Sequence, residues 1–375
     1  MLALLVLLIG GVELWARTMD LQVPDWFGPG AQQGGLQTGH PTRLWGMEQG
    51  ERANGDDITT WINSHGLRGE EPELPRPSGR QRILTLGDSS FFGFLVSDED
   101  VFTNQLQRIL RQRGIDVDVI NAGVAGYSIA QHQLFMDEQG WDLDPTLIVY
   151  CNLWSDNTWD TFRDEDLLAT RRFAELNPLV HSAAMRLLAQ ALSKPQTEQG
   201  GRIIMWRGEK GWPEGKTRRV PLSRYISIHD GLIREAASRG IGGAFVIPTN
   251  SFMISGDIDT STAPSWDPYF QAFESLGAHH SQPVVDLNKV FLEAVSDDLA
   301  STDLLLDLMH PSAAGHLRMA QALADALLSA GWPENNLAGQ TEAFDATSIE
   351  DHPAPVWTDD DGAGSSQRYL YDISE

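Results

Sequence analysis

Three side chains that together can perform nucleophilic catalysis occur along the chain in the order serine, aspartate, histidine. Ser89 lies in a Gly-Asp-Ser-Ser tetrapeptide, and Asp307 and His310 lie three residues apart near the C-terminal end. A serine hydroxyl is a weak nucleophile until a histidine takes its proton, and that histidine needs a carboxylate to hold its tautomer. One turn of chain brings Asp307 and His310 to the same side, so we predict a Ser89, His310, Asp307 triad.

The placement of these residues carries more weight than their identity, because Gly-Asp-Ser and Asp-x-x-His are both common turn sequences. Ser89 directly follows an apolar run, and two further polar blocks, residues 121–126 and 152–157, follow the next two apolar runs. Ligands of an open parallel sheet bind beyond the carboxyl ends of its strands. The polar blocks are therefore expected at one edge of a sheet, together with the Asp307–His310 turn.

The elements that must position these residues alternate between apolar runs and amphipathic stretches. This alternation predicts an α/β fold, a flavodoxin-like doubly wound sheet of five parallel strands covered by helices on both faces. Ser97 is the expected N-cap of the first helix, with Asp100 completing a capping box. The expected strands are 83–86, 117–120, 147–151, 243–247 and 284–287, and the expected helices are 97–113, 129–138, 222–239, 266–276 and 312–328.

The remainder of the chain surrounds this core. An insertion over about residues 158–222, with helices expected at Asp164–Glu175 and His181–Leu192, interrupts the alternation and is expected to cap or flank the site. The predicted organisation is a signal or anchor segment 1–17, a linker and N-terminal extension 18–79, a catalytic domain 80–332 and an acidic tail 333–375.

The N-terminal residues 1–12 form an apolar run that Glu13 interrupts. A membrane-spanning helix needs about 20 residues, whereas the apolar part of a signal peptide has about 7–15. The run is compatible with a short membrane anchor, a cleaved signal or a buried N-terminal helix. The first two place the catalytic domain outside the cytoplasm, in the periplasm or cell envelope, which is the expected location.

Composition excludes several classes of function. The 375 residues carry a formal net charge of −25, which disfavours binding to nucleic-acid phosphates. The single cysteine, Cys151, forms no internal disulfide and has no basic neighbour to stabilise a thiolate, so it is expected to be a buried residue at a strand end.

His279 and His280 are adjacent but lack a third ligand at a convincing spacing, and no metal is expected. The oligomeric state is left open.

The strand-end blocks resemble those of the SGNH, or GDSL, hydrolases, and the resemblance covers roughly residues 80–332. The family contains esterases, lipases, thioesterases and carbohydrate deacetylases, with some polysaccharide O-acetyltransferases. The resemblance implies that Ser89 is the nucleophile, with Asp307 and His310 as its partners. It also implies that the backbone N–H groups of Ser89 and Gly126 form an oxyanion hole, and that no cofactor is needed.

One block departs from the family pattern. The third block is normally Gly-x-Asn-Asp, and its Asn donates to the oxyanion, but here Ser155 stands before the Asp. A side-chain donor of this kind contributes about 3–4 kcal/mol to transition-state stabilisation in a known case. Either Asn152 or Asn157 is expected to reach the oxyanion, with Ser155 as a weaker donor, and the sequence does not rank the two asparagines.

Several alternatives remain at this stage. The leading function is a serine esterase or O-acyltransferase that acts on ester-linked acyl groups, acetyl above all, of a glycan or another envelope substrate. The alternatives are a lipase-like or thioesterase-like acyl hydrolase and an inactive envelope binding module. Ser90 is an alternative nucleophile, and His316 is expected to be structural. Trp154 and Trp159 either pack in the core or stack on substrate.

One further motif, in the N-terminal extension, resembles a family sequence to which we assign no function. The spacing Asn63-x-x-Gly66-x-Arg68-Gly69 is similar to a stretch that precedes the core in membrane-anchored bacterial members of the family. No physical function follows from the sequence alone.

Overall fold

A parallel sheet of five strands forms the centre of the computed structural model. The strand order is β11-β10-β7-β5-β6, so the first strand of the sheet along the chain lies between the second and the third. This is the flavodoxin-like doubly wound order that the sequence predicts. The strands are β5 (Gln81–Gly87), β6 (Val117–Asn121), β7 (Leu147–Cys151), β10 (Gly242–Ile247) and β11 (Val284–Asp286). The structure describes residues 2–18, 35–55, 57–176, 182–184, 215–255, 268–296 and 300–351.

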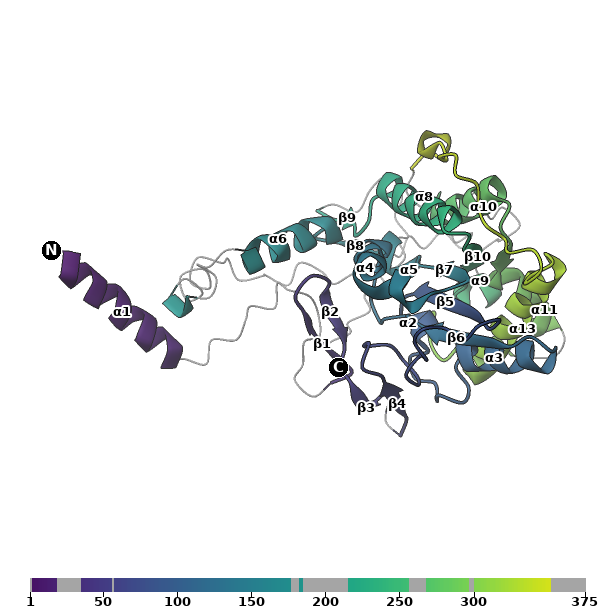
Figure 1. Cartoon of the computed structure of the whole chain (residues 1–375), viewed down its shortest axis with the longest axis horizontal. Helices are drawn as coiled ribbons and strands as arrows, with labels where there is room; N and C mark the ends of the chain where they lie inside the picture. Colours follow the sequence, from purple (N-terminus) through teal and green to yellow (C-terminus); the bar gives the residue numbers. More distant parts are fainter. Residues whose placement is uncertain are drawn as a thin grey trace, which may run out of the picture.

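Helices cover both faces of this sheet (Figure 1). Alternate residues of a strand point to opposite faces, so Leu84 and Leu86 belong to one apolar core and Ile83 to the other. Because both faces are buried, the strands are almost continuously apolar. The first core includes α4 (Ile129–Phe135), α8 (Leu222–Ser238) and α10 (Pro268–His280), and the second includes α3 (Phe102–Gln112), α11 (Leu287–Ser296) and α13 (Ala313–Ser329).

Most predicted boundaries are shifted by one to five residues, and two of the shifts change how a short sequence signal is used. Helix α3 begins after an N-cap at Val101, not at Ser97. The Ser97 hydroxyl instead bonds the carboxylate and the backbone N–H of Asp100 within the preceding turn, so the expected cap closes a turn and not a helix. Leu287 was expected to end the last strand but begins α11. The short segments are α2 (Ser89–Phe92), η2 (Met136–Gly140), η3 (Trp141–Leu143), α5 (Trp154–Asn157), α9 (Ser251–Ser255), α12 (Ser301–Leu304) and η6 (Ala346–Ser348).

The N-terminal extension contains two antiparallel hairpins. One pairs β1 (Gln37–His40) with β2 (Leu44–Met47), and the other pairs β3 (Gly50–Ala53) with β4 (Thr59–Ile62). An isolated bridge between Arg68 and Asn121 joins the chain just beyond the second hairpin to edge strand β6. Apolar residues of the extension pack with residues of the loops that follow β5 and β6, in a core of Leu44, Trp45, Met47, Ile62, Phe92, Val124 and Tyr127. The extension therefore contacts the carboxyl edge of the sheet.

A buried ion pair joins the two ends of the described part of the insertion. It contains β8 (Trp159–Asp160), helix α6 (Asp164–Leu176) and β9 (Thr217–Arg218), and β8 and β9 pair antiparallel. Nε and Nη2 of Arg219 lie 2.9 and 2.7 Å from the two carboxylate oxygens of Asp164, and both side chains are fully buried. The helix predicted over 181–192 lies outside the described residues except at residues 182–184.

Helix α1 spans Leu2–Thr18 and so covers residues 2–17 of the predicted signal or anchor segment. Within the described ranges, no helix has both the length and the apolarity needed to cross a membrane. The last part of the acidic tail, residues 352–375, lies outside the described residues.

Four of the described histidines are buried, and burial lowers the pKa of each, most strongly for His132, His229 and His316. Burial lowers the pKa of His132 to about 4 and the pKa of His229 and His316 to about 3. Nδ1 of His316 accepts the backbone N–H of Phe102, which agrees with the structural role expected for this residue. Between pH 6.5 and these lowered values, the unfolded chain binds protons that the folded chain excludes, so each of the three groups makes folding less favourable as the pH falls.

We predict that His229→Phe makes the stability of the protein less sensitive to acid. His229 lies among the rings of Tyr150, Tyr225 and Phe273, which a phenyl ring can also contact. Acidification from pH 7 to pH 5 should lower the unfolding free energy of the wild type by about 2 kcal/mol more than that of the variant. Urea unfolding followed by circular dichroism measures this difference, and parallel pH curves for the two proteins would contradict it.

Candidate active site

The nucleophile turn forms where β5 ends. Asp88 is the N-cap of the one-turn helix α2, and Ser89 is its first residue. The turn requires glycine at position 87, because a Cβ there would lie 2.6 Å from Cβ of Phe91. Ser89 itself is half-buried, so its hydroxyl remains accessible at the carboxyl edge of the sheet.

The Asp307–His310 turn is closed by the carboxylate of Asp307. Its Oδ1 accepts the backbone N–H groups of Met309 and His310, at 2.9 and 2.8 Å. Its Oδ2 lies 2.6 Å from Nδ1 of His310. Because a carboxylate can only accept, the Nδ1 atom carries the proton, and Nε2 of the imidazole is left as an acceptor.

The two turns meet although 221 residues separate them. Nε2 of His310 lies 2.7 Å from Oγ of Ser89, so the three predicted residues form one hydrogen-bonded chain from hydroxyl to imidazole to carboxylate. Burial alone would raise the pKa of Asp307, but the hydrogen bond from His310, its charge and the two backbone donors lower it to about 2. Asp307 is therefore ionised throughout the neutral range, as a group that stabilises an imidazolium must be.

Asp88 has a structural role that the sequence analysis did not assign. Its Oδ1 accepts the N–H of Ser90 at 3.1 Å, and its Oδ2 accepts the N–H of Ser155 at 3.2 Å. One fully buried carboxyl group thus joins the nucleophile turn to the segment after β7, and burial raises its pKa. The available signal was the Asp of the Gly-Asp-Ser sequence, whose partner on another strand could not be identified before folding.

Ser90, the alternative nucleophile, points to a different partner. Its Oγ donates to the carbonyl of Met309 at 3.2 Å, and the residue is buried. This bond ties the turn after β5 to the Asp307–His310 turn. Ser90 is thus a link between the two catalytic turns, while the bond to His310 belongs to Ser89.

The candidate oxyanion donors occupy different environments. Gly126 adopts a left-handed conformation with φ +77°, which favours glycine, in the loop after β6. Ser155 is buried in α5 (Trp154–Asn157), and its backbone N–H donates to Oδ2 of Asp88 next to the nucleophile turn. Asn157 is buried in the same short helix, and its carbonyl accepts Nη1 of Arg218.

Asn152, in contrast, is hydrogen-bonded to another side chain in the interior. It is fully buried, and its Nδ2 lies 2.8 Å from Nδ1 of His132. The Nε2 atom of His132 bonds the carbonyl of Ala122, so Nε2 is the donor and Nδ1 must accept the Asn152 amide. This contact directs the Asn152 amide toward His132, and the geometry favours Ser155 over Asn152 as a donor beside Ser89.

The other residues singled out in the sequence have structural contacts. Burial raises the pKa of the Cys151 thiol, with the nearby Asp88 adding to the rise. Nε2 of His280 lies 3.0 Å from Oδ1 of Asp230, and Nε2 of His279 is hydrogen-bonded to the backbone carbonyl of Glu342. No group of three metal-ligating side chains gathers among the residues that the structure describes.

The two tryptophans are both buried. Trp154 belongs to the apolar core, where its ring meets the edge of Phe270. The guanidinium of Arg218 stacks over the ring of Trp159, with 4.6 Å between its Cζ atom and the centre of the ring. Of the two interpretations left open, these contacts favour packing for Trp154.

Comparisons with known proteins show a likeness of fold. No protein-family model matches the chain, and no curated protein matches it. Among solved structures, the acetyl xylan esterase AlAXEase is 15% identical, with 66% of this chain and 99% of that chain covered and a TM-score of 0.43. The acetylxylan esterase Axe2 of Geobacillus stearothermophilus is 16% identical, with 67% and 94% covered and a TM-score of 0.43.

A lipolytic protein of the G-D-S-L family from Desulfitobacterium hafniense is 14% identical, with 66% of this chain and 100% of that chain covered and a TM-score of 0.41. Identities and TM-scores at this level assign neither a family nor an activity to the chain. The chemistry must be argued from the site, which holds a hydroxyl, an imidazole and an ionised carboxylate in the arrangement of a serine nucleophile and its base.

The two adjacent serines provide a direct test of this arrangement. Ser89→Ala should abolish covalent labelling by a fluorophosphonate probe, because it removes the hydroxyl that bonds the imidazole of His310. Ser90→Ala should retain labelling but lower stability by about 1–3 kcal/mol, since the buried Met309 carbonyl loses its donor. Mass spectrometry of the labelled proteins and urea unfolding measure both effects. Labelling that survives in Ser89→Ala and disappears in Ser90→Ala would reverse the assignment.

Proposed function

We propose that the protein is a serine esterase in which Ser89 is the nucleophile, His310 the general base and acid, and Asp307 the group that orients and stabilises His310. The observation that carries this proposal is the chain of two short hydrogen bonds, 2.7 Å from Ser89 to His310 and 2.6 Å from His310 to Asp307. A nucleophile within hydrogen-bond reach of a base, itself oriented by a third group, is the signature of this chemistry.

The proposed reaction proceeds by acyl transfer through the enzyme. Oγ of Ser89 attacks the ester carbonyl as Nε2 of His310 takes its proton, and the carbonyl oxygen becomes an oxyanion. The C–O bond to the alcohol then breaks, and His310 returns the proton to the leaving alcohol. Nε2 of His310 then takes a proton from a water molecule, whose oxygen attacks the carbonyl of the acyl–Ser89 ester. The bond to Oγ breaks, the carboxylic acid leaves, and His310 returns the proton to Ser89.

The proposed oxyanion hole consists of the backbone N–H groups of Ser89 and Gly126 and the hydroxyl of Ser155. The bond between the Ser155 N–H and Asp88 holds Ser155 beside the nucleophile turn. A hydroxyl is shorter than the amide at this position in the resembled family, so the expected stabilisation is smaller than that from an asparagine.

We further propose that the substrate carries an acetyl or another short acyl group, ester-linked to a glycan or another envelope polymer. Its support is the resemblance of the four sequence blocks to those of the SGNH, or GDSL, hydrolases. The two-step reaction transfers the acyl group to a sugar hydroxyl if that hydroxyl replaces water, so hydrolysis and O-acyl transfer share the same acyl–Ser89 intermediate.

The proposal predicts turnover of p-nitrophenyl acetate that depends on the triad. Asp307→Asn should lower kcat by about 10⁴-fold with little change in KM, because the asparagine holds the wrong tautomer of His310. Ser89→Ala should be inactive with its thermal unfolding unchanged. Steady-state kinetics over esters of increasing acyl length, together with release of acetate from an acetylated glycan, tests the substrate class. A preference for long acyl chains would contradict the acetyl proposal but not the esterase, and wild-type turnover retained in Ser89→Ala would overturn both.

Ser155→Ala tests the third oxyanion donor. Loss of the hydroxyl should lower kcat by up to about 100-fold and leave KM nearly unchanged, because the oxyanion exists only in the transition state. Asn152→Ala is the matched comparison, and it should affect stability through its contact with His132 more than it affects kcat. An unchanged kcat in Ser155→Ala, measured with the same ester, would exclude Ser155 as a donor.

A further inference from the structure

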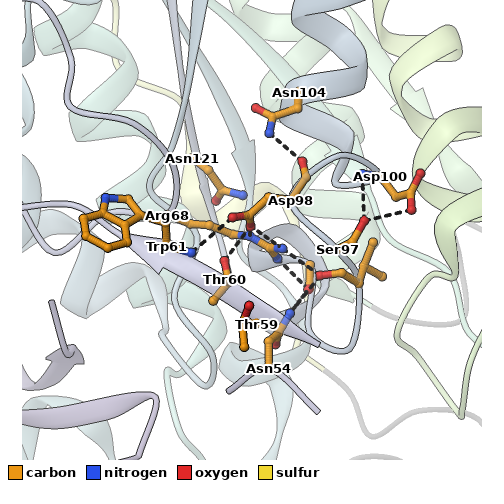
Figure 2. Close-up of polar contacts among 12 residues, drawn as sticks. Asn54, Thr59, Thr60, Trp61, Arg68, Ser97, Asp98, Asp100, Asn104 and Asn121 are labelled. Carbon is orange, nitrogen blue, oxygen red and sulfur yellow. Dashed lines mark hydrogen bonds and ion pairs between the residues drawn. The ribbon is translucent and has the colours of Figure 1, made fainter. Parts of the chain in front are cut away.

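The arginine of the Asn-x-x-Gly-x-Arg-Gly motif is buried beside the nucleophile turn. Only 4% of the surface of Arg68 is exposed, although the residue lies in the N-terminal extension, outside the parallel sheet. A buried guanidinium needs hydrogen-bond acceptors for its donors. Figure 2 shows Arg68 with its partner Asp98 and the neighbouring Asn54 and Asn121.

Three of these acceptors are backbone carbonyls of the segment that follows Ser89. Nη1 of Arg68 donates to the carbonyls of Phe92 and Gly93, at 2.7 and 2.6 Å, and Nη2 donates to the carbonyl of Val96 at 2.7 Å. Nε donates to the carboxylate of Asp98 at 2.8 Å. The guanidinium therefore binds residues 92–98 from one side.

Two asparagines bind the same segment. Nδ2 of Asn54 donates to the carbonyls of Gly93 and Val96, and its Oδ1 accepts the N–H of Leu95. Nδ2 of Asn121 donates to the carbonyl of Phe92 at 3.3 Å. The last carbonyls of a helix have no partner within the helix, and here buried side chains from outside α2 satisfy them.

The bound segment reaches both partners of the proposed reaction. The N–H groups of Gly93 and Phe94 donate to the carbonyl of Ser89, so the segment closes directly on the nucleophile. The ring of Phe94 packs against the ring of His310, with 5.2 Å between their centres. Gly93 is the left-handed C-cap of α2, and a Cβ there would lie 2.7 Å from Nη1 of Arg68, so the guanidinium packs tightly against this turn.

We propose that Arg68 is a positioning residue for the ester hydrolysis proposed above, on which this inference rests, and that Asn54 assists it. Arg68 binds the carbonyls of residues 92, 93 and 96. It thereby fixes Phe94 against His310 and holds the C-terminal end of α2, the helix that begins at Ser89. The extension before the core is then part of the active-site scaffold. Arginine suits this position because its planar fork offers several donors in fixed directions, which a single ammonium group does not reproduce.

Arg82 provides a matched control. It is also fully buried and also donates to two backbone carbonyls, those of Leu143 and Glu73, but it lies at the start of β5, at the opposite edge of the sheet from Ser89. Arg82→Met and Arg68→Met both remove a buried guanidinium that satisfies carbonyls. Only the second removes one that binds the segment carrying Phe94.

The test compares these variants in the full-length protein, below the melting temperature of each. Arg68→Met should lower kcat for p-nitrophenyl acetate by about 10- to 100-fold, the cost of a misplacement of about 1 Å in a catalytic group, with KM changed little. Arg82→Met should lower stability and leave kcat within about twofold of wild type. If Arg68→Met does not fold, Asn54→Ala takes its place in the test, since loss of the Asn54 amide also removes hydrogen bonds to the carbonyls of Gly93 and Val96.

A double-mutant cycle tests whether the effect passes through Phe94. The loss of kcat caused by Arg68→Met should shrink to about twofold in a Phe94→Ala background, because the contact that Arg68 supports is then already absent. An undiminished loss in that background, or a kcat in Arg68→Met equal to that in Arg82→Met, would overturn the inference.

A readout independent of turnover separates this inference from the proposed function. The NMR signal of the His310 ring, identified by its loss in His310→Gln, should shift and change its pH titration in Arg68→Met but not in Arg82→Met. An unchanged His310 signal in Arg68→Met overturns the positioning role even if the enzyme is active. A wild type that turns over no ester and takes no fluorophosphonate, but in which His310 responds to Arg68→Met, overturns only the esterase proposal.

Discussion

The hydrogen bond between Oγ of Ser89 and Nε2 of His310 is the contact on which the candidate site depends. It joins two turns that are 221 residues apart in sequence, and neither turn is part of a long element that would hold it rigidly. A hydrogen bond of 2.7 Å is maintained only if both backbones are fixed to within a few tenths of an ångström. Much of the polar structure around the site can be understood as meeting this requirement.

Buried polar side chains hold the nucleophile turn from three directions. Asp88 ties it to Ser155 after β7, Ser90 ties it to Met309 beside the base, and Arg68 holds its far end from the extension. Each of these groups loses hydration on burial and is stable there only because it is hydrogen-bonded. Such a satisfied network favours one arrangement over its neighbours, which a purely apolar contact does not do as strictly.

Much of the fold could be predicted from local patterns. The five strands follow from continuous apolar runs, because strands buried on both faces admit few polar residues. The boundary predictions failed where a short local signal was compatible with two structures. The Ser97 hydroxyl closes a turn instead of capping α3, and Leu287 begins a helix at the end of β11. In both cases the local sequence allows either structure, and packing of the neighbouring elements decides between them.

The sequence by itself determined the chemical groups of the site and their order, because Ser89, Asp307 and His310 are recognisable by type and by their place after apolar runs. Only the tertiary structure decided what each polar side chain faces. It directs Asn152 to His132 and places Ser155 beside the nucleophile turn. The reason is physical: the partner of a buried polar group comes from another strand or loop, and its identity is set by how the elements pack and not by neighbours along the chain.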